Sequence, residues 1–232
     1  WNWPRTLSCA PTIPKSKKPW ACKTQQTLKY LLKSEPAKIT FRHRSQPLAD
    51  QFDTLSDQHQ DFLSRQKIFF TGTAAPIGRV NISPRPTDVF RIINGNRVAY
   101  LDYIGSGNET AAHTRKLPRM TIMTCAFEGP PRILRMYGTA STHQTGTPEF
   151  QSLLRDHYDN TAPRNTRQIV VLDIDLVQTS CGYGVPLFDY QGDRPNLSRW
   201  ADAKSDDELV EYRTLKNTKS IDGFETGHID GQ

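Results

Sequence analysis

The residues of this chain with the clearest capacity for chemistry lie at positions 105–110, Gly-Ser-Gly-Asn-Glu-Thr. An apolar run typical of a strand precedes them, and residues that favour a short helix follow. A glycine-rich turn at the start of a helix presents free backbone N–H groups and hydroxyls, which together suit an anion such as phosphate. The sequence therefore predicts a phosphate site here, although a plain turn between two antiparallel strands would also fit.

A dinucleotide fingerprint is another interpretation of the same segment. Gly105 and Gly107 match its first two glycines, and Ala111 could take the place of the third small residue. Glu128 lies about 20 residues further on, where a ribose-binding carboxylate is expected. However, Pro118 stops the helix after roughly seven residues, whereas a parallel crossover needs about a dozen. The spacing therefore disfavours a Rossmann unit.

A second group of polar side chains follows from the alternating sequence RVNISPR. We expect Val80 and Ile82 to pack on the core. Asn81, Ser83 and Arg85 then lie in a row, about 7 Å apart, on the opposite face of the strand. An amide, a hydroxyl and a guanidinium at this spacing could bind an anion, and a solvated sheet face is the alternative.

The scaffold that must position these groups is predicted to be mainly β. The dipeptide Asn94-Gly95, between FRII and RVAYLD, is a strong hairpin signal. Consecutive antiparallel strands with short helices between them indicate a small β-barrel. The other strands are expected at 68–73, 119–125, 132–140 and 167–178, with helices along Phe52, Leu55, His59 and Phe62, after Thr147-Pro148 and after the capping box at Ser205.

Positive charge is concentrated at the N-terminus. The formal net charge is +6, yet residues 1–45 hold ten Lys or Arg and one Glu, and the other 187 residues hold 20 basic and 23 acidic side chains. The basic segment has little hydrophobic periodicity, which favours a disordered extension over residues 1–48. It could attach to an anionic polymer or membrane, or target an organelle. The remainder gives no reason to expect specific nucleic-acid binding.

The sequence gives little indication of a metal site or of a membrane-spanning segment. The four cysteines form no C-x-x-C pair and lack zinc-ligand spacing with histidines, so no metal site is predicted. Asp173 and Asp175 share one strand face, where we expect them to be solvated or paired with arginine rather than to form an acid/base pair. No apolar run reaches about 18 residues, so we expect a soluble, cytoplasmic protein without a membrane partner.

Five sequence blocks resemble those of the pyridoxamine 5′-phosphate oxidase-like, FMN-binding split-barrel proteins. They occur in order along about 170 residues, and residues 1–48 match nothing in that family. The blocks are VNISPRP (80–86), VAYLDYIGSGNETAAH (98–113), CAFEGPPRILRMYG (125–138), TSCGYGVP (179–186) and KNTKSIDG (216–223).

The resemblance implies a fold, a cofactor and a partner. The fold is a six-stranded antiparallel Greek-key split β-barrel with short peripheral helices. Residues 49–195 would form this FMN-binding barrel, and residues 196–232 a C-terminal helix and tail that pack on it. The partner is a second copy, in a homodimer with flavin at the interface. Carried over by position, the cofactor-binding residues are Asn81, Ser83, Arg85, Ser106, Gly107, Asn108, Glu109, Thr110 and, as a cover for the flavin ring, Tyr183.

The chain departs from the family pattern in two places. Arg85-Pro86 stands where the subgroup has Lys-Gly, which keeps the charge but removes an N–H and stiffens the bend. Glu109 stands where a positive charge would help phosphate binding most, and we find no C-terminal substrate motif containing arginine. Authentic pyridoxamine phosphate oxidation is therefore not expected.

The expected function is that of a flavin-dependent oxidoreductase acting on an unknown small molecule. The alternative is a flavin- or haem-binding protein of the same fold without turnover. No catalytic residue is assigned. His113 could act as a general acid, although a structural role at the end of a helix suits its position better.

Overall fold

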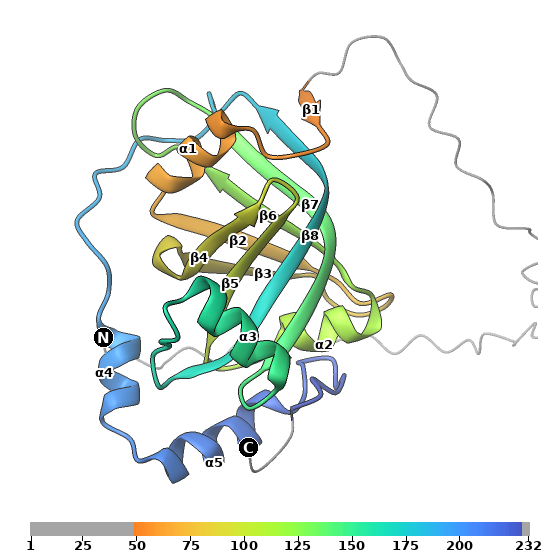
Figure 1. Ribbon diagram of the computed structural model, residues 1–232, viewed down its shortest axis with the longest axis vertical. Helices are drawn as coiled ribbons and strands as arrows, with labels where there is room; N and C mark the ends of the chain where they lie inside the picture. The colour runs from red at the N-terminus through yellow and green to blue at the C-terminus, as the bar shows by residue number, and fades with distance from the viewer. Residues whose placement is uncertain (1–48, 229–232) are drawn as a thin grey trace, which may run out of the picture. The chain divides into compact units, whose positions relative to one another are not determined.

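Figure 1 shows the computed structural model of the chain, which describes residues 49–228. The predicted basic extension over residues 1–48 lies outside the described residues. The strands are β1 (Asp50–Phe52), β2 (Ile68–Thr73), β3 (Asn81–Pro86), β4 (Phe90–Asn94), β5 (Arg97–Tyr103), β6 (Arg119–Cys125), β7 (Ile133–Gln144) and β8 (Thr166–Ser180). The helices are α1 (Asp57–Arg65), α2 (Glu109–Lys116), α3 (Pro148–His157), α4 (Asn196–Asp202) and α5 (Asp206–Asn217), with a 3₁₀ turn η1 (Thr87–Val89).

The strands form one antiparallel sheet that curls into a half-barrel (Figure 1). Its order is β3-β2-β6-β7-β8-β5-β4, and β1 pairs with the end of β8. The predicted split barrel with short helices is confirmed, but the predicted strand number of six was wrong because the described part of the sheet has eight strands. The three residues of β1 are all exposed and show no alternation, so no sequence pattern predicts that strand.

The core fills the inside of this curled sheet. The side chains of Val98, Tyr100, Ile122, Leu134 and Met136 are completely buried there. The Asn-Gly hairpin forms as predicted, joining β4 to β5. Among the described residues, no helix is both long and apolar enough to cross a membrane.

The side chains of β3 point in the directions opposite to those that we expected from its alternating sequence. Val80 and Ile82 are 69% and 70% exposed, while Asn81, Ser83 and Arg85 turn inward and are partly buried. The reason lies on the neighbouring strand. The residues of β2 that pair with Ser83 and Asn81 are threonines 71 and 73, which are buried and bring hydroxyl groups to the inner face. The inside of the barrel is therefore polar at this edge.

Local capping signals set the helix boundaries. Helix α1 begins after Ser56, which forms a capping box with His59, so the periodicity that started at Phe52 overestimated its length. Thr147 caps α3, and Ser205 with Glu208 forms the capping box of α5, both as predicted.

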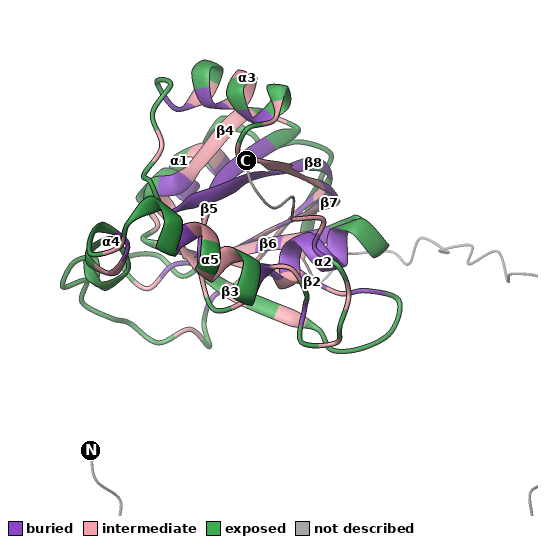
Figure 2. Cartoon of the chain, turned by 90° about the horizontal axis from the view of Figure 1, so that it is seen from below, coloured by how far each residue is buried: buried purple, intermediate pink, exposed green. Residues whose placement is uncertain are grey.

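The C-terminal part of the chain runs back over the barrel. After β8, residues 181–195, here called the strap, pass down one side of the barrel to α4 (Figure 1). Helices α4 and α5 lie with α2 at one end of the barrel, as Figure 2 shows from below. A segment from the end of α5 therefore reaches the glycine-rich turn, residues 105–110.

Candidate functional site

A cavity of about 1130 Å³ lies between β3, the glycine-rich turn and the segment after α5. We call it the turn cavity. Lys216, Lys219 and Ser220 from the C-terminal segment also line it, although sequence analysis gave them no role. It brings together most of the residues predicted to hold the cofactor, namely Asn81, Ser83, Arg85, Ser106, Gly107, Glu109 and Thr110.

The two remaining predicted residues do not line this cavity. Asn108 is buried behind the turn, where its Oδ1 accepts a hydrogen bond of 2.9 Å from Gln168. Tyr183 lies on the strap and is 83% exposed, away from the other predicted residues. The structure thus leaves the proposed ring-covering side chain outside the site.

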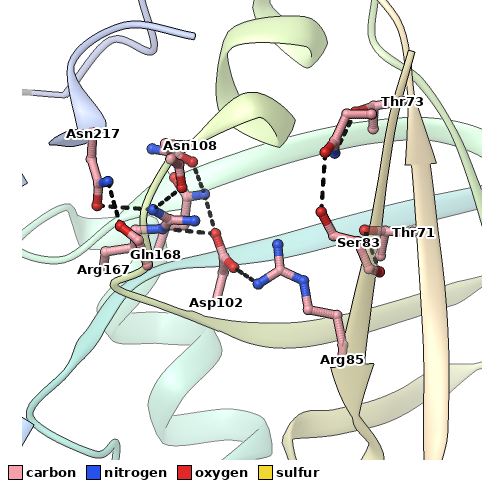
Figure 3. Close-up of polar contacts among 12 residues, drawn as sticks. Thr71, Thr73, Ser83, Arg85, Asp102, Asn108, Arg167, Gln168 and Asn217 are labelled. Atoms are coloured by element: carbon pink, nitrogen blue, oxygen red, sulfur yellow. Dashed lines mark hydrogen bonds and ion pairs between the residues drawn. The ribbon is translucent and has the colours of Figure 1, made fainter. Parts of the chain in front are cut away.

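A buried carboxylate organises the cationic side of the cavity (Figure 3). Asp102 is fully buried on β5 and forms an ion pair with Arg85, which reaches across from β3. Its other oxygen, Oδ2, accepts hydrogen bonds from Arg167 Nε at 3.0 Å and from Gln168 Nε2 at 2.6 Å. Two guanidiniums share one carboxylate, so the cluster keeps one net positive charge beside the cavity.

The charges of this cluster are stable at neutral pH. Burial alone would raise the pKa of Asp102, but the facing guanidiniums of Arg167 and Arg85 outweigh burial and lower that pKa below its ordinary value. Burial alone would lower the pKa of Arg85, and Asp102 raises it. Both groups therefore stay ionised, and the net positive charge does not depend on pH in the physiological range.

Arg167 also fixes the shape of the glycine-rich turn. Its Nη1 donates to the carbonyl oxygen of Gly107 at 2.7 Å and to Asn217 Oδ1 at 2.9 Å. Asn217, at the end of α5, donates in turn to the carbonyl oxygen of Gly105 at 2.9 Å. Residues of β8 and α5 thus hold the turn through its carbonyl oxygens. This fixes the position of the N–H and hydroxyl donors of the turn.

The donors of the turn and of β3 fit a phosphate group. No side chain caps the N-terminus of α2, because the amide of Asn108 bonds Gln168 instead, and Glu109 and Thr110 of its first turn line the cavity. Arg85 Nε is buried and has no hydrogen-bond partner within the described part of the chain. An uncapped helix N-terminus, a guanidinium with a free donor and nearby hydroxyls form a donor set that an anion would satisfy.

Glu109 is the carboxylate of the glycine-rich turn itself, and it opposes an anion there. Its carboxylate accepts hydrogen bonds from the backbone N–H of Ile221, at 3.1 Å to one oxygen and 3.2 Å to the other. The next residue, Asp222, accepts from the N–H of Arg79 and also forms an ion pair with the Arg79 side chain, and these contacts lower the pKa of Asp222. Glu109 therefore helps to hold the C-terminal segment over the mouth of the cavity.

The inner face of β3 continues into a chain of hydrogen bonds. Ser83 Oγ donates to Asn81 Oδ1 at 3.1 Å, and Asn81 Nδ2 donates to Thr73 Oγ1 at 3.3 Å. Thr73 Oγ1 lies 3.1 Å from Nδ1 of His113, which is buried and does not line the turn cavity. His113 thus packs α2 against β2, which favours the structural role over that of a general acid.

Sequence reasoning missed Asp102, Arg167 and Asn217. A charged residue within the apolar run VAYLDY was the one available signal, because an acid at a core position requires a partner. The partner could not be identified locally, since Asp102 meets Arg167 through the register of β5 on β8, 65 residues away. These residues hold the turn and Arg85 in place.

Comparisons with known proteins agree on one family. A family model described as pyridoxamine 5′-phosphate oxidase matches residues 55–181. The curated protein ustO of Aspergillus flavus, described as a pyridoxamine 5′-phosphate oxidase family protein, is 35% identical over 189 residues, which cover 75% of this chain and 76% of that protein.

Similar solved structures have low sequence identity to this chain. One is a putative pyridoxamine 5′-phosphate oxidase from Lactobacillus delbrueckii, with a TM-score of 0.43, 14% identity and coverage of 54% of this chain and 94% of that one. Another is HutZ, a haem storage protein from Vibrio cholerae, with a TM-score of 0.36, 17% identity and coverage of 54% and 95%.

Proposed function

The chain belongs to the pyridoxamine 5′-phosphate oxidase family, and on that premise we propose that it binds riboflavin 5′-phosphate (FMN) in the turn cavity and acts as a flavin-dependent oxidoreductase on a small molecule. One observation carries the proposal. Arg85 from β3 and the uncapped N-terminus of α2 face the same cavity, and the guanidinium keeps a buried donor without a partner. A phosphate monoester would supply the missing acceptor.

Each residue of the site has a distinct part in this proposal. Arg85 and the hydroxyls of Ser106 and Thr110 would hold the phosphate, together with the first backbone N–H groups of α2, while the hydrogen bond from Ser83 orients Asn81 beside them. Asp102 and Arg167 would keep Arg85 and the turn in position. Bound flavin would supply the redox chemistry, since hydride transfer belongs to the cofactor. The protein's own contribution is binding, orientation and exclusion of water.

Pyridoxamine phosphate is not the substrate that we propose. Glu109 places a negative charge in the glycine-rich turn, where the family pattern favours a positive one, and no arginine-containing substrate motif of that pattern follows β8. The same carboxylate favours a second candidate function, in which the protein holds flavin or haem without turnover. If the protein is an oxidoreductase, we expect the charged group of its substrate to bind outside the turn cavity.

We propose that the functional unit is a homodimer formed through the outer face of β3 and β2. Val80 and Ile82 are exposed on that face beside the partly buried Phe70 and Met123, around a groove of about 600 Å³. A contiguous apolar patch on an exposed edge strand is typical of a surface that binds another chain. Ile82 points outward and Arg85 inward from the same strand, so a partner on this face would contact the strand that carries Arg85.

Light scattering after gel filtration tests the dimer. The wild-type chain should elute with twice the chain mass, and Ile82→Glu (I82E) should elute as a monomer. Leu215→Glu is the matched control, because Leu215 on α5 is 71% exposed and Ile82 is 70% exposed. A wild-type monomer, or dissociation by both variants alike, would contradict this interface.

The absorption spectrum of the full chain after addition of FMN and desalting tests the cofactor. We expect retained flavin in the wild type and its loss in Arg85→Gln (R85Q). Arg155→Gln, on the exposed surface of α3, should retain it. Reduction of the bound flavin by NADH or NADPH would then support an oxidoreductase, and a flavin that these donors do not reduce would support the binding protein. Absence of retained flavin would refute both.

A further inference from the structure

Two of the five sequence blocks that resemble the family play no part in the turn cavity. They supply the loop 127–132, with sequence FEGPPR, and the start of the strap. The loop and the part of the strap that follows the second block, residues 188–194, face each other across a second cavity, of about 1070 Å³, which we call the strap cavity. Its walls are the loop and residues 188–194 of the strap, and the ends of α1, β2 and β3 also line it.

The walls of the strap cavity are held in place without a ligand. A Cβ atom at Gly182 would lie 2.7 Å from the backbone nitrogen of Arg132, so only glycine permits this approach of strap and loop. Further along, the N–H of Phe188 donates to the carbonyl oxygen of Phe127 at 3.0 Å, and their rings lie 5.4 Å apart. The N–H of Tyr190 donates to Glu128 Oε1 at 3.2 Å. The cavity is thus preformed.

Aromatic rings and prolines make its walls flat and apolar. Phe62, Phe127, Phe188 and Tyr190 line it, and the rings of Phe188 and Tyr190 are 59% and 45% exposed. Such rings on an ordered surface favour a planar aromatic ligand, which can stack on them or meet them edge to face.

The polar groups of the cavity favour an anion. Arg132 is half-buried, its guanidinium lies 5.7 Å from the ring centre of Phe62, and it forms no ion pair with any described residue. The carboxylate of Glu128 already accepts the N–H of Tyr190. Asp193 lies beside the Tyr190 hydroxyl and raises the pKa of Tyr190. Of the other basic residues that line the cavity, Arg85 is paired with Asp102, and Arg65, Lys67 and Arg194 are exposed. Arg132 is therefore the half-buried planar donor that suits a carboxylate.

The strap cavity meets the turn cavity at the end of β3. Pro84, Arg85 and Pro86 line both cavities, and so do Asp193 and Arg194 of the strap. Arg85 points to Asp102 on the side of the turn cavity. A molecule in the strap cavity would therefore adjoin the turn cavity, where the cofactor is proposed to bind.

We propose that the strap cavity is the substrate compartment and that it takes an aromatic carboxylate, with the carboxylate on Arg132 and the ring against Phe188 and Tyr190. The assignment as a substrate rests on the proposed flavin function. The ligand class follows from the cavity itself and is tested without turnover.

The test is equilibrium binding of 2-naphthoate to the full chain, measured by calorimetry with and without FMN. The neutral 2-naphthalenemethanol serves as the uncharged probe. We expect naphthoate to bind about tenfold more tightly than the alcohol, the gain typical of one charge-assisted pair. Arg132→Gln should remove that preference, and Arg132→Lys, which keeps the charge but not the planar donor, should keep part of it. Arg155→Gln, on the exposed surface of α3, should leave the preference unchanged.

The outcomes separate this inference from the proposed function. Equal affinity for the two probes, or a preference that survives in Arg132→Gln with unchanged circular dichroism, would overturn the compartment. Phe188→Ala should lower the affinity for both probes by the same factor. Unchanged affinity in this variant would show that the probes bind outside the strap cavity. FMN retention should be the same in Arg132→Gln and wild type. A protein that binds naphthoate through Arg132 but never retains FMN would refute the flavin function and leave the anion preference of this cavity standing.

Discussion

Replacement of Asp102 by asparagine (D102N) tests the buried cluster most directly. Asp102 is fully buried, and the side chains of its partners Arg85 and Arg167 are 15% and 5% exposed. The variant keeps the size of the side chain but leaves two guanidiniums in the barrel without a counter-charge. Removal of one member of a buried ion pair typically costs about 3–5 kcal/mol. We expect a loss of unfolding free energy of that size.

Urea denaturation measures this loss. With an m value of about 2–3 kcal/mol per M, the midpoint should fall by about 1–2.5 M. Asp173→Asn is the matched control, because Asp173 also pairs with an arginine, Arg97, but both side chains are about half exposed, at 51% and 49%. An exposed pair contributes about 0–1 kcal/mol. If D102N costs no more than the control, the two arginines do not depend on Asp102 and this account of the site is wrong.

The same comparison has a defined pH dependence. The pKa of Asp102 is lower in the folded protein than its ordinary value of 3.8, so the charged carboxylate stabilises the fold above that value. The contribution should be constant from pH 7 to about pH 5 and should decrease as the pH falls through 3.8 toward the folded pKa. The difference in urea midpoint between wild type and D102N should shrink accordingly, and a difference that grows on acidification would contradict the assignment.

Two further predictions concern the strap and the glycine-rich turn. Gly182→Ala should displace the strap, because the added Cβ would meet the backbone of Arg132. Hydrogen exchange of the strap amides should therefore accelerate. Gly184→Ala is the control and should leave exchange unchanged, because nothing lies within 4 Å of a Cβ atom at that position. Glu109→Gln keeps an acceptor for the N–H of Ile221 but removes a negative charge from the turn cavity, so FMN should bind about fivefold more tightly, or by about 1 kcal/mol, in a fluorescence titration. Unchanged or weaker FMN binding in this variant would show that Glu109 does not face the phosphate.

Local patterns predicted the elements well but not the orientation of the strand that matters most. Alternation along β3 shows which residues share a face, and it does not show which face is inside. Apolar Val80 and Ile82 therefore looked like core residues, yet the buried hydroxyls of Thr71 and Thr73 on β2 make the inner face polar. The exposed apolar face that results is the basis for the proposed dimer.

Long-range pairing explains what the sequence could not reveal about the site. The turn and β3 were identified from their own residues, and they do line one cavity. The groups that hold them, Asp102 and Arg167, meet only because β5 pairs with β8 in a particular register. Tyr183 shows the reverse case, since its motif suggested a cover for the flavin and the strap instead leaves it exposed.

The measurement that tests the central claim most directly compares the binding of FMN and riboflavin to the full chain by flavin fluorescence. The two ligands differ only in the phosphate, which Arg85 and the start of α2 are proposed to hold. We expect FMN to bind at least about tenfold more tightly, since charge-assisted hydrogen bonds contribute about 1.5–3 kcal/mol each, and R85Q to abolish most of that difference. Equal affinities for the two ligands, or a preference for FMN that R85Q leaves intact, would contradict the claim that these groups form a phosphate site.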